Sequence, residues 1–298
     1  KACASIRSLC QGKHLHAYVC SDENLSSNTY IGNTIVSMYG KCGALKDAEC
    51  AFHALPCRDT VSWNGMLSAY IEHGQNEKAL CLYRQMQGEA TSPDGATFVT
   101  VFQACGQLAE LQQEEEDASS DTISRSNLRN FQEIGHALHA DAVRSGFASN
   151  VFVENTILGI YGKCRSVHEA ENVFNRTSKH VVSWNAMLSA LLEVREGKKA
   201  LYLYKEMHKC CVNPDKWTLN IVLQACGISW DEEAAIDNEL SKVMLVKLCY
   251  SLHVDCVHKG LADDCVVGNT IVCTYSKVGC INDALTVLNG LSRTTVSS

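Results

Sequence analysis

The stretch VSWNGMLSA at residues 61–69 returns almost unchanged as VSWNAMLSA at residues 182–190. A second set of matching segments comprises NTIVSMYGKC at 33–42, NTILGIYGKC at 155–164 and NTIVCTYSK at 269–277. A third pair is QACG at 103–106 and 224–227. Internal similarity of this kind marks an array of repeats. It outweighs the two globular domains that a length of 298 residues alone would suggest.

Each unit of the array has the pattern of two amphipathic helices. In residues 60–94, Val61 and Met66 belong to a first apolar stripe, residues 73–75 interrupt it, and a second stripe follows. Pro93 prevents the second helix from continuing. Such a hairpin has an apolar face on each side, so it must stack on its neighbours. The sequence therefore predicts an all-α fold, a right-handed α-solenoid of stacked helix-turn-helix repeats.

These landmarks divide residues 29–294 into seven units. Their expected boundaries are 29–59, 60–94, 95–150, 151–180, 181–215, 216–264 and 265–294. Residues 1–28 are expected to end an earlier unit, because GKHLHA at 12–17 parallels GHALHA at 135–140. Residues 295–298 would begin another unit. We therefore expect the chain to be a piece of a longer protein.

Two of the units are lengthened by acidic insertions, near residues 112–132 and 229–242. The most acidic runs are EEED at 114–117 and DEE at 231–233. We expect solvated loops or flexible segments at the turns of these two hairpins. The first insertion has two basic and five acidic residues and the second has one and five, so the rest of a chain with net charge −7 is neutral.

Seventeen cysteines raise the question of disulfides or a zinc site. Several recur at matched positions, as Cys42 and Cys164 do in one set and Cys105 and Cys226 in another. A cysteine that recurs once per repeat on a helix is typically a small buried residue. No paired C-x2-C and H-x3-H ligand set is present, so we expect no metal and no cofactor, and a reducing compartment. No run approaches 18 apolar residues, so no membrane span is expected.

Several segments carry a resemblance to a known family. They are VFVENTI at 151–157, VVSWNAM at 181–187, MYGKCG at 38–43, and ALHA at 137–140 leading to SGF at 145–147. With the alternation of units near 35 and 31 residues, they resemble the PLS subclass of plant pentatricopeptide repeat (PPR) proteins, of the organellar RNA-editing type. The resemblance makes residues 1–28 a partial long-type repeat. It implies a protein of the mitochondrion or chloroplast that reads single-stranded RNA one base per repeat, with editing-factor proteins as further partners.

The resemblance also implies which residues contact a base. The fifth residue of each unit would contact the base edge: Asn33, Asn64, Val99, Asn155, Asn185, Asn220 and Asn269. The last residue would contact the same edge: Asp59, Asp94, Asn150, His180, Asp215, Asp264 and Thr294. The second residue would wedge against the base: Tyr30, Val61, Ala96, Phe152, Val182, Trp217 and Val266. A side-chain amide suits a base edge because it is both donor and acceptor.

An Asn at the fifth position with an Asp at the last, or closing, position of the same unit resembles the family's combination for uracil. Val99, which offers no contact to a base edge, would make its unit a spacer. The expected target is 5′-U-U-N-Y-U-U-Y-3′. Three alternatives remain open: capping of helices by the Asp residues, hydrogen bonding of the Asn residues within the stack, and core packing of the second residues. The recurrent lysines Lys41, Lys163 and Lys277 either contact phosphates or are solvated. With neutral repeats, phosphate contacts should be few.

Three functions are compatible with such an array. The leading hypothesis is a sequence-specific RNA-binding module that selects a pyrimidine-rich or U-rich site for C-to-U editing or related RNA processing. A protein-interaction scaffold of the tetratricopeptide type is the alternative, disfavoured by the recurrent Asn and by the lack of a W-x2-L-G-x2-Y signature. An enzyme is the least favoured, because H-x-E zinc-deaminase and phosphate-loop motifs are both missing. We therefore expect no catalytic residue and no small-molecule substrate.

Overall fold

The protein is a series of helical hairpins in a computed structural model. The residues that the structure describes are 8–118, 124–234, 239–261 and 264–296. The chain divides into two compact units, residues 1–160 and 161–298, with the division inside helix α10. Within each unit, successive hairpins stack in chain order. The expected all-α solenoid of helix-turn-helix repeats is confirmed.

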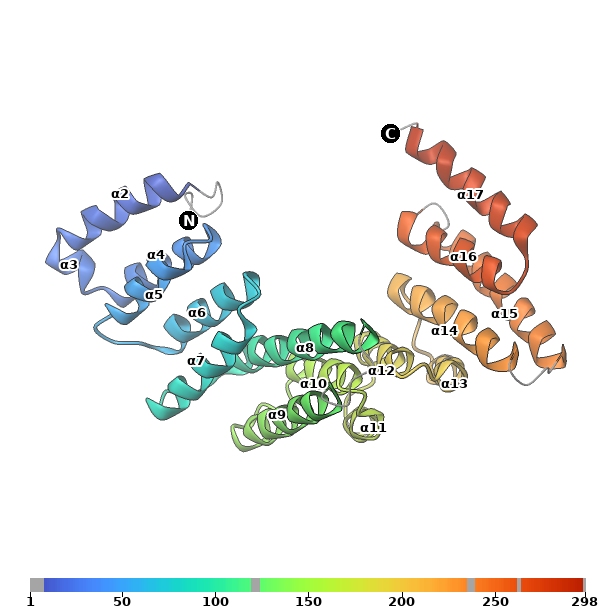
Figure 1. The fold of residues 1–298 in the computed structure, drawn as a ribbon, viewed down its shortest axis with the longest axis horizontal. Coiled ribbons are helices and arrows are strands. Elements are labelled where there is room, and N and C mark those ends of the chain that lie inside the picture. Colours follow the sequence, from blue (N-terminus) through green and yellow to red (C-terminus); the bar gives the residue numbers. More distant parts are fainter. Residues whose placement is uncertain (1–7, 119–123, 235–238, 262–263, 297–298) are drawn as a thin grey trace. The chain divides into compact units, whose positions relative to one another are not determined.

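The first unit occupies the blue-to-green part of the chain in Figure 1. Its helices are α2 (Leu9–Cys20), α3 (Glu23–Ser26), α4 (Thr29–Lys41), α5 (Leu45–His53), α6 (Thr60–Glu72), α7 (Asn76–Gly88), α8 (Gly95–Ala118), α9 (Ser124–Arg144) and most of α10 (Val151–Lys163). Hairpins form from α4 with α5, α6 with α7, and α8 with α9. The first helices of these hairpins also contact one another, α4 against α6 and α6 against α8.

The second unit repeats this arrangement. Its helices are the end of α10, α11 (Val167–Phe174), α12 (Val181–Glu193), α13 (Gly197–Lys209), α14 (Lys216–Ala234), α15 (Glu239–His258), α16 (Cys265–Lys277) and α17 (Ile281–Val296). The first helices α12, α14 and α16 contact one another in that order. Each unit therefore contains a row of first helices, on which the fifth residues of its repeats lie. None of the helices described here is long and apolar enough to cross a membrane.

The hairpin of residues 60–94 shows how local sequence sets the helix ends. Asp59 caps α6: its carboxylate accepts the backbone N–H of Ser62, and the Ser62 hydroxyl accepts the N–H of Asp59. The break expected after α6 is confirmed, and Gly74 in that break has a φ of +69°, which suits glycine. Pro93 lies between α7 and α8, outside both helices, as its missing N–H requires.

The acidic insertions are largely helical, so the expectation of loops was wrong. α8 and α9 have 24 and 21 residues, whereas α6 and α7 have 13 each. α14 and α15 are likewise long, with 19 and 20 residues. The end of α8 is rich in Gln, Glu, Leu and Ala, which are good helix formers, so this sequence prolongs the hairpin. Residues 119–123 and 235–238, which belong to the two insertions, lie outside the described residues.

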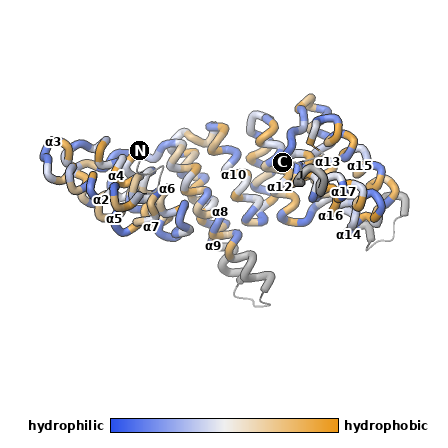
Figure 2. The backbone as a smooth tube through the Cα atoms, turned by 90° about the horizontal axis from the view of Figure 1, so that it is seen from above, coloured by the Kyte–Doolittle hydropathy of each residue, from blue (hydrophilic) through white to orange (hydrophobic). Residues whose placement is uncertain are grey.

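Aromatic contacts between neighbouring helices form the core of each unit. Trp63 of α6 is fully buried and meets Phe52 edge-on, with ring centroids 4.9 Å apart. Trp184 and Phe174 make the same contact at 5.0 Å in the second unit. Apolar and polar residues alternate along the helices (Figure 2), as a two-sided hairpin requires. Val61, expected in the apolar stripe, is instead 63% exposed.

The recurrent cysteines are packing residues, as expected. Cys105, Cys164 and Cys226 are buried and Cys42 is partly buried. Burial raises the pKa of Cys164 to about 11, so this residue is a thiol at neutral pH. Packing does not explain every cysteine, because others, such as Cys81, are exposed. In the part of the chain described, no group of three or more His, Cys, Asp or Glu residues could hold a metal ion.

Gly40 of α4 allows the close approach of two first helices. A Cβ atom at this position would lie 2.7 Å from the Cβ of Ala69 in α6, and one at Gly162 would lie 2.8 Å from that of Ala190. Real atoms do not approach so closely, so Gly40→Ala must separate α4 from α6. We expect this variant to lower the free energy of unfolding by about 1–3 kcal/mol, measured by urea denaturation followed by circular dichroism.

The matched control is Gly65→Ala, on α6. A Cβ atom added there has no neighbour within 4 Å. Because alanine favours the helix more than glycine does, the control should raise the free energy of unfolding by up to about 1 kcal/mol. If both variants changed stability by the same amount in the same direction, close helix approach would not be the reason for Gly40.

Candidate nucleic-acid interface

A polar triad lies at the junction between residues 60–94 and the next repeat. Asn64 of α6 donates through Nδ2 to Oδ1 of Asp94 at 3.0 Å. The hydroxyl of Thr97, on α8, lies 2.7 Å from Oδ1 of Asn64 and 2.9 Å from Oδ1 of Asp94. The same Asp94 oxygen accepts the backbone N–H of Thr97 at 2.8 Å. The last residue of one repeat thus binds the fifth residue of its own repeat and the third residue of the next.

Two further junctions have the same geometry. They are formed by Asn33, Asp59 and Ser62 in the first unit and by Asn185, Asp215 and Thr218 in the second. The amide nitrogen lies 3.1 and 3.0 Å from the carboxylate oxygen in these two triads. The hydroxyl oxygen lies 2.6 and 2.7 Å from the amide oxygen. The arrangement therefore recurs at three junctions and is not confined to one site.

The triad leaves part of the Asn side chain available to a ligand. An amide has two N–H donors and a carbonyl oxygen with two lone pairs. Asn64 uses one N–H for Asp94 and accepts one hydrogen bond from Thr97, and its side chain is only partly buried. Hydrogen bonding within the stack and capping by the Asp residues therefore both occur. They are compatible with base recognition, because one donor and one lone pair remain.

The closing aspartates are held in the charged form. Burial raises the pKa of Asp94, but hydrogen bonds from the Thr97 backbone, the Asn64 amide and the Thr97 hydroxyl outweigh burial and hold the pKa below its usual value. The pKa values of Asp215 and Asp59 are lowered by the same balance. At neutral pH these carboxylates are acceptors only, so each obliges its Asn partner to point an N–H toward it.

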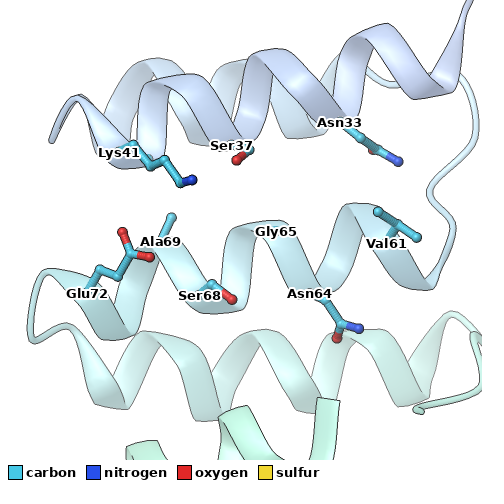
Figure 3. Close-up of a pocket in the computed structure, with 10 residues that line it drawn as sticks. Asn33, Ser37, Lys41, Val61, Asn64, Gly65, Ser68, Ala69 and Glu72 are labelled. Atoms are coloured by element: carbon cyan, nitrogen blue, oxygen red, sulfur yellow. The ribbon is translucent and has the colours of Figure 1, made fainter. Parts of the chain in front are cut away.

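A groove of about 350 Å³ lies between α4 and α6, beside the first two triads (Figure 3). Its lining residues are Asn33, Ser37, Gly40, Lys41, Val61, Asn64, Gly65, Ser68, Ala69 and Glu72. Asn33 and Asn64 lie at one end of the groove, and Lys41 and Glu72 lie at the other. Small residues line its middle, so a planar group can approach both amides. The groove thus brings together the fifth residues of two successive repeats.

The second residues of the repeats are exposed. Their exposed fractions are 70% for Tyr30, 63% for Val61, 77% for Phe152, 53% for Val182, 59% for Trp217 and 48% for Val266. Ala96 is exposed as well. Core packing, the alternative explanation for these residues, is therefore wrong. An exposed apolar side chain one turn before the polar triad offers a surface for the face of a base.

The repeat of residues 216–264 departs from the triad. Asp264 accepts from Nζ of Lys216 at 2.6 Å and from the backbone N–H of Val267 at 3.2 Å. Asn220, 8% exposed, accepts from the hydroxyl of Thr270 at 2.6 Å. The third residue after the closing Asp is here Val267, which has no hydroxyl to join Asn and Asp. Asn220 and Asp264 were expected to select uracil as a pair, but in the structure each of them binds another residue.

The remaining predicted positions are Val99, Asn150, Asn155, His180, Asn269 and Thr294. Val99 is half-buried, while Asn150 caps α10 by accepting the N–H groups of Phe152 and Val153. His180 and Asn269 are exposed. Asn155 and His180 belong to the same repeat but lie on either side of the division between the two compact units, so their pairing stays a prediction. The side chain of Thr294 lies outside the described part of the structure.

The recurrent lysines differ in their surroundings. Lys41 is exposed at the end of the groove. Lys277, at the matching position of α16, lies 3.7 Å from Asp231 of the second acidic insertion. The same carboxylate lies 3.6 Å from Arg195. Both ion pairs are largely solvated, so each contributes little to stability. The insertion nevertheless places an acidic side chain beside one lysine that was a candidate phosphate contact.

The hydroxyls of Ser62, Thr97 and Thr218 were not among the predicted site residues. All three side chains are buried, with exposed fractions of 0%. The signal was in the sequence, because each is the third residue after a closing Asp and so completes a helix-capping pattern. That pattern explains the contact with Asp but not the contact with Asn. The second contact needs the packing of two successive first helices.

Fold and junction together define a class of protein: an array of helical hairpins in which a polar triad links consecutive repeats. Residues 58–107 and 179–227 match the PPR repeat family, and residues 155–179 match the PPR repeat. The chain therefore contains PPR repeats in these segments.

Plant proteins are similar over much of the chain. "Pentatricopeptide repeat-containing protein At1g03540" of Arabidopsis thaliana is 31% identical over 227 residues, which cover 76% of this chain and 33% of that protein. "Pentatricopeptide repeat-containing protein At4g25270, chloroplastic", also of Arabidopsis thaliana, is 30% identical over 301 residues, covering 100% and 50%. The chain thus spans half or less of the length of these relatives.

A solved structure has the same fold. The crystal structure of the pentatricopeptide repeat protein PPR10, a maize protein, in complex with an 18-nt psaJ RNA element is similar with a TM-score of 0.50. The two chains are 17% identical, and the match covers 90% of this chain and 40% of that one. At this identity the likeness concerns the fold alone.

The lowered pKa values of the closing aspartates predict that the fold is less stable in acid. Their pKa values in the folded chain lie below the unfolded value of about 3.9, so they stabilise the fold above that pH, and this contribution is lost as the pH falls through the folded-state pKa. The free energy of unfolding should therefore drop below about pH 4 and drop less in Asp94→Asn/Asp215→Asn, which keeps a capping side chain. Urea denaturation at a series of pH values measures this. The same drop in both proteins would refute it.

Proposed function

We propose that the chain is a repeat module that binds single-stranded RNA in a sequence-specific manner, with one base per repeat. The observation that carries this proposal is the recurrence of the triad at three junctions, each with an exposed apolar residue near its Asn. PPR10, which has a similar fold, was crystallised with an RNA element, and this supports the proposal. A scaffold for proteins would not need the same amide at the same place in successive repeats.

In the proposed complex, a base that faces a triad lies between the second residue of that repeat and the second residue of the next. The base of repeat 29–59 stacks between Tyr30 and Val61, which are both exposed. The free N–H and lone pair of Asn33 then face the base edge. Uracil presents a donor N3–H beside acceptor carbonyl oxygens, so one amide can satisfy both. Stacking supplies affinity for any base, while the amide supplies the choice of base.

The proposed order of bases follows the triads. Repeats 29–59, 60–94 and 181–215 select uracil through the triad. The other bases of the proposed target 5′-U-U-N-Y-U-U-Y-3′ rest on the resemblance alone, including the sixth, whose repeat 216–264 lacks the triad. The RNA would be an organellar transcript that undergoes C-to-U editing or related processing, with editing-factor proteins as partners. The chloroplastic designation of relatives such as the At4g25270 protein supports the choice of a plant organelle. In this proposal any deaminase activity resides outside the present chain.

The first test is binding of the whole chain to labelled RNA, measured by fluorescence anisotropy at low salt. The probes contain 5′-U-U-A-U-U-U-U-3′ or the same length of adenine. We expect the U-rich RNA to bind more tightly, and Asn64→Ala/Asn185→Ala to weaken that binding by roughly thirtyfold to a thousandfold, because the two substitutions remove about four hydrogen bonds, two from each amide. The adenine probe should be nearly unaffected by the substitutions.

The matched control is Asn172→Ala, an exposed asparagine on the second helix α11. This variant should bind the U-rich RNA within about twofold of the wild-type chain, because α11 carries no predicted base contact. Equal affinity of the wild-type chain for both probes would refute the proposed base selection. Undetectable binding of both RNAs by the folded chain would instead favour the scaffold alternative.

A further inference from the structure

We propose that the buried hydroxyl of the following repeat is a specificity-determining positioning residue: Thr97 orients the amide of Asn64, and Thr218 and Ser62 orient those of Asn185 and Asn33. This inference rests on the proposed base reading. The fifth and last residues of a repeat are expected to select the base, and this inference adds the third residue of the next repeat to them. In it, the residue that sets the choice of base lies in the neighbouring repeat and does not itself touch RNA.

The geometry of the triad carries the inference. The backbone N–H of Asp94 donates to the Thr97 hydroxyl at 3.1 Å, and that hydroxyl lies closer to the Asn64 oxygen, at 2.7 Å, than to the Asp94 oxygen, at 2.9 Å. A hydroxyl has one proton, and this one is shielded from water because Thr97 is 0% exposed. The chain of hydrogen bonds therefore runs from the Asp94 backbone through the hydroxyl to the amide oxygen of Asn64.

The hydroxyl and the carboxylate act on opposite ends of the amide. Asp94 accepts from Nδ2 of Asn64, and Thr97 donates to its Oδ1. Each contact alone favours the same orientation of the amide, but one hydrogen bond opposes its rotation less strongly than two. Together they fix which side of the groove receives the free N–H and which receives the free lone pair. If the Asn64 amide were turned by half a rotation, so that Nδ2 and Oδ1 exchanged places, its oxygen would face the Asp94 carboxylate and two acceptors would lie against each other.

A fixed amide discriminates between the two pyrimidines. Uracil presents a donor at N3 and an acceptor at position 4, whereas cytosine presents an acceptor and a donor at the same places. The ring is the same size, so stacking between apolar residues cannot distinguish them. An amide held in one orientation matches uracil and opposes cytosine, whereas a rotating amide accepts both. Loss of the hydroxyl should therefore reduce discrimination more than affinity for uracil.

The chain contains its own contrasting case. After Asp264 the third residue is Val267, and the carboxylate is bound by Lys216 instead of by an amide. The oxygen of Asn220 receives the hydroxyl of Thr270, which lies one turn further along the next first helix. The amide of this repeat is thus held at one end by a different residue. We expect this repeat to discriminate less between uracil and cytosine.

The experiment compares two triads within one molecule. Dissociation constants of the whole chain are measured for 5′-U-U-A-U-U-U-U-3′ and for RNAs with cytosine at the second or the fifth base, which face repeats 60–94 and 181–215. Thr97→Val should lower the U-over-C ratio at the second base by about threefold to tenfold, the value of one hydrogen bond, and leave the ratio at the fifth base unchanged. Thr218→Val should do the reverse.

Two variants separate positioning from structure. Thr97→Ser keeps the hydroxyl and should keep the wild-type ratio. Thr100→Val removes a hydroxyl from the same helix that donates only to its own backbone at Ala96, so it should change neither ratio. In an Asn64→Ala background, Thr97→Val should have no further effect at the second base, because the hydroxyl acts through that amide. Circular dichroism confirms that each variant is folded.

The outcomes are distinct. If the wild-type chain discriminates uracil from cytosine and Thr97→Val and Thr218→Val discriminate equally well, the hydroxyl does not position the amide and the inference falls alone. An equal loss at both bases in either variant would indicate a general structural effect and would also overturn it. If the wild-type chain does not discriminate at either base, the proposed uracil reading fails, and the inference fails with it.

Discussion

A single carboxylate oxygen joins consecutive repeats at three junctions of this protein. Oδ1 of Asp94 accepts a side-chain N–H of Asn64, on the preceding first helix α6, and the backbone N–H of Thr97, on the following helix α8. The same oxygen thus caps the N-terminus of a helix and binds the amide that is the candidate base contact. The start of each first helix therefore fixes where its neighbour's Asn points, so the geometry of the site is inseparable from the geometry of the repeat.

Close packing of the first helices keeps these junctions in register. Gly40 faces Ala69 between α4 and α6, at the first of these junctions, and the same close approach recurs between Gly162 of α10 and Ala190 of α12, where the closing residue is not an Asp. The long repeats preserve this arrangement, because α8 and α14 still begin directly after Asp94 and Asp215 and the extra residues extend their far ends. Length is thus added away from the junctions at which these two repeats begin.

Much of the fold followed from local sequence. Apolar stripes, the break at Gly74 and the stop at Pro93 predicted the hairpins, because helix starts and stops depend on nearby residues. The acidic insertions were misread as loops, since high charge indicates exposure to water but says nothing against a helix. Val61 was assigned to an apolar stripe although it is exposed, because an apolar residue in the first turn fits either a core or a binding surface.

The sequence by itself determined the all-α array, the helix ends, and the repeated Asn and Asp at the fifth and last positions. Only the tertiary structure decided which side chains meet. Thr97 follows Asp94 by three residues, which predicts a cap, but its contact with Asn64 spans 33 residues and depends on how α8 lies against α6. The equivalent spacing after Asp264 ends in other partners. A hydrogen bond needs its atoms within about 3 Å, and only the packing of helices, not spacing along the chain, sets that distance.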